Sequence, residues 1–210
     1  MPFLGRDARR SLTTAMTRRS SRSEEPATSL WPVNEPTNAG ALAFGSHGLF
    51  FREWRSEDAE TMVALFDTDQ MNRWTPLASP FTASVAREYI DQARQARTDD
   101  TVQLAILLAP GTAPVGEVIV FPSDSADEVE LAYAVGAEHQ GQRVATRAVL
   151  AALELARTRG SRRALLTIAI GNRGSAAVAR ATGFAETGAS LRERRRKGFV
   201  LQMQTWSRDV

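Results

Sequence analysis

The sequence contains no cysteine, and its only histidines are His47 and His139. Disulfide bonds, thiolate nucleophiles and cysteine-ligated metal sites are therefore excluded. The two histidines are far apart in the sequence, whereas an imidazole-rich metal site needs several such ligands close together. We therefore predict no metal site and no chemistry that depends on a thiol of the protein.

Long hydrophobic runs are also missing. No run approaches the roughly 20 apolar residues that span a bilayer, and the N-terminus lacks the apolar segment of a secretory signal. The hydrophobic fraction of 43% is ordinary for a globular chain, so these residues are available for a packed core. We expect a cytoplasmic protein without a membrane partner.

Lysine is almost absent, because Lys197 is the only one among 26 basic residues. Arginine codons are GC-rich, so we expect a GC-rich, bacterial source. The formal net charge is only +2, and Glu193 interrupts the basic run at 192–197. A nucleic-acid partner is therefore not expected, although the basic runs at 18–22 and 192–197 keep it as an alternative.

Length and composition indicate one domain with an extension. A chain of 210 residues can bury one core but is short for two typical domains. Residues 1–47 are rich in Ser, Thr, Pro and Arg and show little hydrophobic periodicity, so we expect a disordered or loosely ordered N-terminal extension there. Residues 48–210 are expected to form the folded domain.

Hydrophobic periodicity predicts an α+β domain. Apolar runs with period two predict strands, and apolar residues at helical spacing predict helices. The predicted strands are 49–54, 102–108, 115–121, 129–135, 164–170, 184–189 and 199–206. One helix is predicted to begin after Ser56, and three more to occupy 83–97, 142–159 and 175–182. Residues 71–82, with Pro76 and Pro80, are predicted to be an apolar loop. This order predicts a mostly antiparallel sheet with one parallel crossover.

The most informative segment is ELAYAVGAEHQGQRVAT, residues 130–146. A strand runs into a glycine-bearing turn that opens a long helix, so free backbone N–H groups and the helix dipole point to one spot. Such a spot suits a phosphate group. Because many strand-to-helix turns contain glycine and bind nothing, this segment alone is weak evidence for a phosphate site.

Further segments extend this pattern. They are the strand ending at Ile170, the run NRGS at 172–175, the sequence ATGF at 181–184 and, upstream, FREWRSEDAE and RWTPL. From about Leu49 to Ser207 the sequence resembles the GNAT superfamily, and within it the RimJ/RimL-like N-acetyltransferases. The resemblance implies a mixed, mostly antiparallel central sheet with splayed central strands, flanked by helices, and acetyl-CoA as co-substrate.

The resemblance also implies where CoA binds. In the superfamily, pantetheine fills the gap between the splayed strands and pairs with strand backbone, and the phosphates lie on the loop before the helix. The implied CoA contacts are Ala134, Val135, Gln140, Gly141, Gln142, Arg143, Val144, Ala145, Thr146 and Asn172. A backbone N–H near Ala134 could polarise the thioester carbonyl. Asn172 is equally a candidate for an ordinary turn residue.

Arg143 departs from the superfamily loop, which has glycine at that position. If the position requires a positive φ, or if bare backbone touches the phosphates there, arginine is costly. If the residue lies in the first helical turn, φ is ordinary and the guanidinium can meet a CoA phosphate. We expect CoA binding to be retained, because Gly141 still relaxes the turn.

Acetyl transfer to an amine needs a base, because amines are largely or partly protonated near neutral pH. Glu130 occupies the strand position of the glutamate base in histone-acetylating members of the superfamily; the alternative is an edge-strand glutamate that faces solvent. Ser175 stands where RimJ/RimL-like relatives have a serine that protonates the departing thiolate; the alternative is a helix N-cap. Trp74 would face the acceptor pocket unless it belongs to the core.

The combined prediction is an acetyl-CoA-dependent N-acetyltransferase that acts by direct attack of a primary amine in a ternary complex. The acceptor is a small molecule or a protein N-terminus. The sequence leaves the choice between a monomer and a homodimer open. The main alternative is a GNAT-fold protein that binds CoA or another ligand without catalysis.

Overall fold

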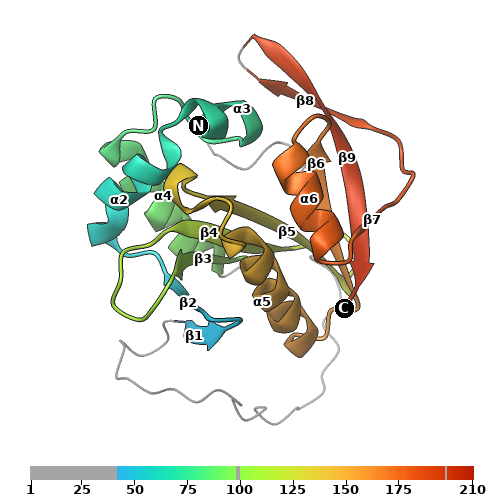
Figure 1. Cartoon of the computed structure of the whole chain (residues 1–210), viewed down its shortest axis with the longest axis horizontal. Coiled ribbons are helices and arrows are strands. Elements are labelled where there is room, and N and C mark those ends of the chain that lie inside the picture. Colours follow the sequence, from blue (N-terminus) through green and yellow to red (C-terminus); the bar gives the residue numbers. More distant parts are fainter. Residues whose placement is uncertain (1–41, 98–99, 197) are drawn as a thin grey trace, which may run out of the picture.

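One mixed sheet runs through the protein, and helices lie on both of its faces (Figure 1). The computed structural model describes residues 42–97, 100–196 and 198–210. The strands are β1 (Ala43–Ser46), β2 (Leu49–Glu53), β3 (Val102–Leu107), β4 (Gly116–Pro122), β5 (Glu128–Val135), β6 (Arg163–Ala169), β7 (Ala185–Glu186), β8 (Arg192–Arg196) and β9 (Phe199–Asp209). Their order is β1-β2-β3-β4-β5-β6-β9-β7, and β8 pairs with the first part of β9.

The helices divide between the two faces of the sheet. They are the short η2 (Ser56–Asp58) and η4 (Ala137–His139), and α2 (Ala59–Phe66), α3 (Asp69–Trp74), α4 (Ala83–Ala96), α5 (Val144–Thr158) and α6 (Arg173–Ala181). Residues of α2, α3 and α4 form one buried cluster with Ala105 and Leu107 of β3, and residues of α5 and α6 belong to a second cluster on the other face. None of the described helices is long and apolar enough to cross a membrane.

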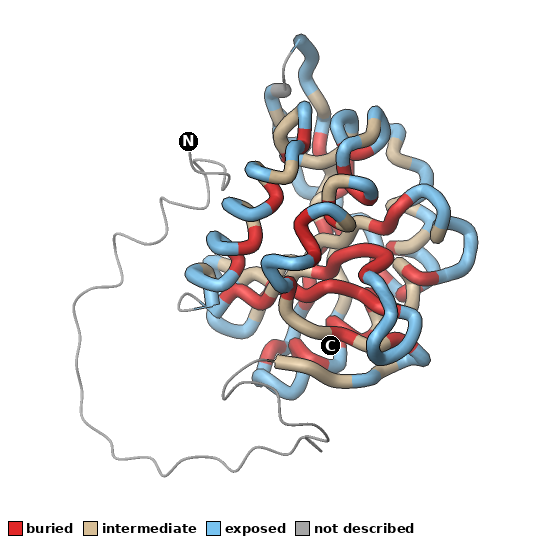
Figure 2. The backbone as a smooth tube through the Cα atoms, turned by 90° about the vertical axis from the view of Figure 1, so that its left-hand side faces the viewer, coloured by how far each residue is buried: buried red, intermediate tan, exposed pale blue. Residues whose placement is uncertain are grey.

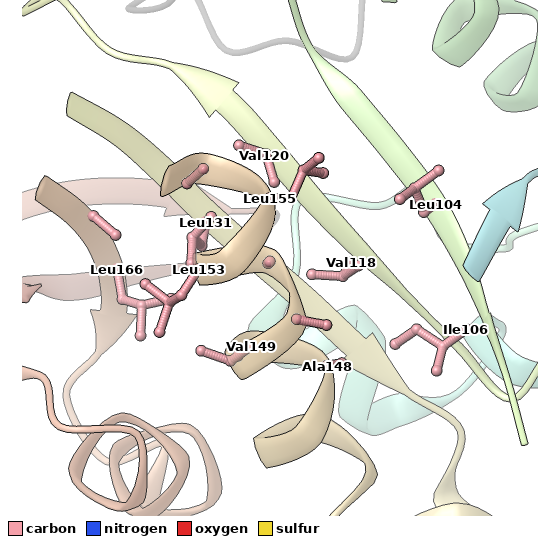
Figure 3. Close-up of a cluster of buried hydrophobic side chains, with 14 of the residues drawn as sticks. Leu104, Ile106, Val118, Val120, Leu131, Ala148, Val149, Leu153, Leu155 and Leu166 are labelled. Carbon is pink, nitrogen blue, oxygen red and sulfur yellow. The ribbon is translucent and has the colours of Figure 1, made fainter. Parts of the chain in front are cut away.

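α5 supplies the centre of the second cluster. Its buried side chains Ala148, Val149, Leu153 and Leu155 point toward apolar residues of β3, β4, β5 and β6 (Figure 3). Alanine at several of these inward positions lets the helix lie close to the sheet. Figure 2 shows the resulting pattern, in which buried stretches run through the interior and exposed residues lie on the outer turns. Burying one such leucine contributes roughly 1.5–3 kcal/mol.

The predicted α+β plan is confirmed. β5 and β6 are parallel, and every other strand pair among the described residues is antiparallel. α5 makes the crossover between the two parallel strands. The sheet, flanked by helices on both faces, therefore has the architecture that the resemblance implied.

Three predicted elements were wrong in detail. Residues 71–82 are not all loop, because α3 extends to Trp74. The helix ends at Thr75, which precedes Pro76 and has an extended backbone. The basic run at 192–197, for which no strand was predicted, contains β8, which pairs with β9. The strand predicted at 184–189 is limited to Ala185–Glu186.

The predicted N-terminal extension, residues 1–47, lies mostly outside the described residues. Its last part corrects the prediction, because Ala43–Ser46 form β1 and pair with β2. Phe44 also stacks on Phe51 with their ring centroids 5.1 Å apart. The folded domain therefore begins before residue 48. A four-residue strand with one large apolar side chain is too short to produce a detectable period.

A buried carboxylate joins α4 to the sheet. Glu117 of β4 is 3% exposed. Its carboxylate accepts hydrogen bonds from Trp54 Nε1 at 2.6 Å, the Tyr89 hydroxyl at 2.7 Å and Gln103 Nε2 at 2.8 Å. Burial raises the pKa of Glu117 to about 7, although the three donors oppose the rise. The network keeps this polar group satisfied inside an otherwise apolar layer.

We predict that the free energy of unfolding decreases as pH rises from 4.5 to about 7, because the folded protein retains on Glu117 a proton that the unfolded chain releases at the ordinary pKa of 4.5. This shift corresponds to a loss of about 3 kcal/mol over that interval. Glu117→Gln, which has a similar shape and no proton to lose, should flatten this part of the profile in urea unfolding. Glu88→Gln, on the exposed side of α4, is the matched control. Parallel profiles for wild type and Glu117→Gln would contradict the prediction.

Candidate active site

The parallel strands β5 and β6 separate halfway along their length. Pairing joins residues 128–131 of β5 to residues 163–166 of β6 and then stops, although β5 continues to Val135 and β6 to Ala169. From Ala132 onward, the edge of β5 that faces β6 carries backbone N–H and C=O groups without a ladder partner on that strand. The predicted splay of the central strands is confirmed.

β4 supports the separated part of β5. The β4–β5 ladder extends to Gly116 opposite Val135. A Cβ at Gly116 would lie 2.4 Å from the Ala134 carbonyl oxygen, so no side chain fits there without moving β5. Ala134 and Val135, which were predicted to contact pantetheine, are therefore fixed from one side and open on the other.

The chain turns from β5 through η4 into α5. Gly141 has φ +74° and Arg143 has φ +58°. Arg143 is the N-cap of α5, and its side chain makes no capping hydrogen bond. The first N–H groups of the helix have no intrahelical acceptor, and the helix dipole adds positive potential. The structure thus brings together the predicted phosphate-loop residues Gln140, Gly141, Gln142, Arg143, Val144, Ala145 and Thr146.

The backbone of Arg143 decides between the two alternatives for this residue. It precedes the helix and lies in the left-handed region, so the ordinary φ of a first helical turn is excluded. A residue with a Cβ pays roughly 1–2 kcal/mol for this conformation. Arginine therefore costs stability here, as the sequence suggested for a position that normally has glycine.

We predict that Arg143→Gly raises the free energy of unfolding by about 1 kcal/mol, because glycine adopts the left-handed conformation without a Cβ clash. Gln142→Gly is the matched control, since Gln142 does not have a positive φ. That change should leave stability unaltered or lower it. Thermal unfolding of wild type and the two variants measures both effects. If both glycine substitutions lower stability equally, the left-handed backbone of Arg143 does not cost stability.

Gln140 links the turn to two neighbouring elements. Its Nε2 donates to the Val135 carbonyl at 3.1 Å, and its amide pairs reciprocally with the Gln70 amide of α3 at 3.3 and 3.4 Å. Gln142 also stabilises the turn, since its Nε2 donates to the Glu138 carbonyl at 3.1 Å. Gln140 therefore connects α3 to the end of β5. No local signal predicts this contact, because the two glutamines are 70 residues apart.

Glu130 lies next to the point where the strands part. It is half-buried and is opposite Phe121 of β4 and Leu165 of β6, so β5 is paired on both sides there and is not an edge strand. Strand alternation places Glu130 on the same face as Ala134, which packs at the margin of the α2–α4 cluster. Burial lowers the pKa of Arg194 in β8, and the Glu130 carboxylate partly opposes this shift.

Ser175 lies in the first turn of α6 but does not cap it. The cap is Asn172, whose Oδ1 accepts a hydrogen bond from the Ser175 N–H at 3.1 Å. Among the described residues, the Ser175 hydroxyl has no hydrogen-bond partner. The cap that the sequence offered as an alternative for Ser175 thus belongs to Asn172, and the hydroxyl is free for another contact.

Tyr133 crosses from β5 to α6. Its hydroxyl donates to the Ser175 carbonyl at 3.3 Å. Burial raises the pKa of Tyr133 to about 12, so the phenol is neutral at physiological pH. Tyr133 and Ser175 are 42 residues apart in the sequence, so no local signal predicts that the Tyr133 side chain reaches α6.

Trp74 ends α3 and approaches the end of β6. A Cβ at Gly171 would lie 3.9 Å from Trp74 Cη2, and the Arg73 guanidinium carbon lies 4.8 Å from the centre of the Trp74 ring. Trp74 is half-buried and belongs to neither apolar cluster of the described residues, so it is not a core residue. A hollow of about 500 Å³ touches Gly171 and Asn172 on the α6 side.

Comparisons with known proteins agree with this geometry. A family model described as an acetyltransferase (GNAT) domain matches residues 48–185. Among curated proteins, none matches the sequence significantly. Many solved structures do resemble the protein. They include structures described as ribosomal-protein acetyltransferases and a RimJ, in agreement with the RimJ/RimL-like resemblance of the sequence.

Three of these structures illustrate the similarity. A RimL ribosomal L7/L12 α-N-protein acetyltransferase has a TM-score of 0.72 at 16% identity, over 84% of this chain and 99% of its own. Mycobacterium smegmatis RimJ, in complex with CoA-disulfide, has a TM-score of 0.69 at 19% identity, over 81% and 87%. The microcin C7 self-immunity acetyltransferase MccE, in complex with acetyl-CoA and AMP, has a TM-score of 0.67 at 19% identity, over 78% and 93%.

At these identities the solved structures establish the fold and leave the substrate open. The family model, in contrast, covers more than half of the chain, including β2 to β6, the phosphate-loop residues and α6. Together with the separation of β5 from β6, this match establishes that the protein belongs to the GNAT acetyltransferase domain family.

Proposed function

We propose that this protein transfers an acetyl group from acetyl-CoA to a primary amine by direct attack in a ternary complex. The observation that carries the proposal is the opening between β5 and β6 directly before the start of α5. The unpaired edge of β5 suits the amides of pantetheine, and the N–H groups of the turn suit the phosphates. Structural neighbours in complex with CoA or acetyl-CoA support this assignment.

The side chains around the opening provide what the reaction needs. Glu130 accepts a proton from the acceptor ammonium, and the neutral nitrogen then forms a bond to the acetyl carbonyl carbon. A backbone N–H at Ala134 or Val135 stabilises the developing oxyanion. As the carbon–sulfur bond breaks, Ser175 donates its hydroxyl proton to the thiolate. The second proton, which the nitrogen loses as it becomes an amide, returns to the Ser175 oxygen through solvent. Trp74 borders the acceptor, and Asn172 positions the turn that carries Ser175.

The acceptor is a protein N-terminus or a small-molecule amine. Structural neighbours include acetyltransferases for ribosomal proteins, which supports the first, and MccE in complex with AMP, which supports the second. Fold similarity does not choose between them. The alternative of a CoA-binding protein without catalysis stands on one observation, the strained Arg143 in the phosphate loop.

We predict that acetyl-CoA stabilises the folded protein, by about 2.7 kcal/mol at a concentration 100 times its Kd. Thermal unfolding with and without acetyl-CoA measures the effect, and CMP alone is the control for nonspecific nucleotide binding, because the neighbour MccE is in complex with AMP. A screen of amine acceptors, with detection of the free CoA thiol, then tests turnover. The protein itself contributes no thiol, because it has no cysteine. Binding without turnover of any acceptor would favour the non-catalytic alternative, and absence of binding would exclude both functions.

We predict that Glu130→Gln lowers kcat by about 100-fold at neutral pH, the usual scale for loss of a general base. Affinity for acetyl-CoA should barely change. Part of the activity should return at high pH, where the amine loses its proton to solvent. The measurement is kcat against pH at saturating acceptor. A wild-type kcat across the whole range would show that the enzyme only positions an already neutral amine.

Ser175→Ala is the matched control for that experiment. It should lower kcat by less than Glu130→Gln and show no recovery at high pH, because it removes the proton donor and not the base. Stability should not change, since Asn172 supplies the cap of α6. If the kcat of Ser175→Ala recovers at high pH, Ser175 acts in deprotonating the acceptor amine and not in protonating the thiolate.

A further inference from the structure

The hollow beside α6 lies on the face of the sheet that α5 covers. Its volume is about 500 Å³, within the range of small-molecule sites. α6, the end of β6, β7 and β9 form its walls. Ile168 and Trp206, which line it, belong to the buried cluster of α5 and α6, whereas Glu130 is on the opposite face. The sheet therefore separates the hollow from the proposed base.

The hollow also lies on a side of α6 that does not carry Ser175. Arg173, Ala176 and Arg180 line it at helical spacings of three and four, so they share one side of the helix. Ser175 is two residues after Arg173, which places it about 200° round the helix. Of the predicted CoA contacts, all of which the structure describes, only Asn172 lines the hollow. The hollow is therefore distinct from the opening between β5 and β6.

The indole of Trp206 forms part of the wall. Trp206 is 3% exposed, and its Nε1–H is buried without a hydrogen-bond partner among the described residues. A donor buried in this way has given up water and gained nothing in return, which is costly. The Glu186 carboxylate of β7, opposite Trp206 in the ladder, accepts a hydrogen bond from Gln204 Nε2 at 2.7 Å instead. The protein itself thus leaves the indole donor unused.

Two arginines of α6 lie at the same wall. The Arg180 guanidinium carbon is over the Trp206 ring, 5.2 Å from its centre, and Arg180 pairs with Glu186 at 3.9 Å, longer than a hydrogen bond. Arg173 is exposed and forms no ion pair with the described residues. Glu186 is the one acidic residue of the lining, so two guanidinium groups and one carboxylate leave an excess of one positive charge. A ligand with one negative charge balances it.

Much of the remaining wall is apolar. Ile168 is buried and Ala176 is half-buried, while Ile170 is 54% exposed, the most of any large apolar side chain among the described residues. Together with the indole ring they provide a surface for an aromatic or branched aliphatic group. A mostly apolar wall with a few polar groups is typical of sites for small organic molecules.

We propose that this hollow binds a small monocarboxylic acid with an aromatic or branched apolar group. The carboxylate pairs with Arg173 and Arg180, because planar guanidinium groups match carboxylate oxygens. As Arg180 moves from the ring onto the carboxylate, it uncovers the indole, and a ligand oxygen accepts the Trp206 hydrogen bond. The apolar group packs against Ile170 and the ring. This binding is separate from acetyl transfer and does not depend on it.

The indole N–H signals of nitrogen-labelled protein in NMR spectra test the proposal. The sequence has four tryptophans, and loss of one signal in Trp206→Phe identifies that of Trp206. Phenylacetate or isocaproate at millimolar concentration should shift the Trp206 signal, because its N–H gains an acceptor. Phenylacetamide, the neutral match of phenylacetate, should leave the signal in place.

Arg173→Gln and Arg180→Gln should each weaken the affinity for the carboxylate probe by about 10-fold, the lower end of the range for a hydrogen bond to a charged group. Calorimetric titration measures the affinity independently of the tryptophan signal. Arg87→Gln is the matched control, because Arg87 is exposed on α4, on the other face of the sheet. It makes the same charge change and should keep the wild-type affinity.

Several outcomes would overturn the inference. One is that neither carboxylate shifts the Trp206 signal, and another is that phenylacetamide shifts it equally. A loss of affinity in Arg87→Gln as large as in the α6 variants would show an effect of net charge alone. Saturating acetyl-CoA should leave the affinity for phenylacetate unchanged, and competition between the two would instead place the acid in the opening between β5 and β6.

Discussion

The end of hydrogen bonding between β5 and β6 after Leu131 is the constraint on which the site depends. Backbone groups inside a sheet are normally paired, so an unpaired strand edge in the middle of a sheet can accept an extended ligand. The opening does not collapse, because each side is held elsewhere. β5 remains paired with β4 to its last residue, and β6 remains paired with β9 to Ala169.

The two hydrophobic clusters place the remaining groups around this opening. On one face, α5 packs against β3 to β6, and its first turn therefore begins beside the end of β5. On the other face, α2, α3 and α4 pack as one layer that ends at Ala134. The Glu117 network supports this layer from within. Because each cluster is on one face, the sheet separates the α5 side of the opening from the α2–α4 side.

Polar contacts across the opening complete the arrangement. Tyr133 joins β5 to the first turn of α6, and Gln140 joins the end of β5 to α3. Each contact is a single neutral hydrogen bond or amide pair, which contributes about 0.5–1.5 kcal/mol. They therefore orient elements that apolar packing has already brought together. Arg143 is an exception to this locally satisfied structure, because its backbone is left-handed. The Trp206 indole N–H is another, because it is buried without a hydrogen-bond partner among the described residues.

The sequence by itself determined the elements with strong periodicity. The alternation of β5, the continuous apolar run of β6 and the helical spacing of α4 and α5 all appear at nearly the predicted positions, because burial of one face leaves its period in the residues. The family resemblance predicted site residues at Glu130 on β5, in the turn before α5 and at Ser175 in the first turn of α6. β1, α3 and β8 were missed, since short or arginine-rich segments become regular mainly through the partners they pair with or pack against.

Only the tertiary structure decided how the candidate residues meet. The positive φ of Arg143, the cap of α6 by Asn172 and the contact of Tyr133 with Ser175 depend on backbone placement that no local pattern encodes. The position of β8 likewise follows from the sheet order, in which β8 pairs with the first part of β9 on the edge opposite β6. Local periodicity reports which face of an element is buried, whereas distances between side chains far apart in the chain follow from how those faces pack.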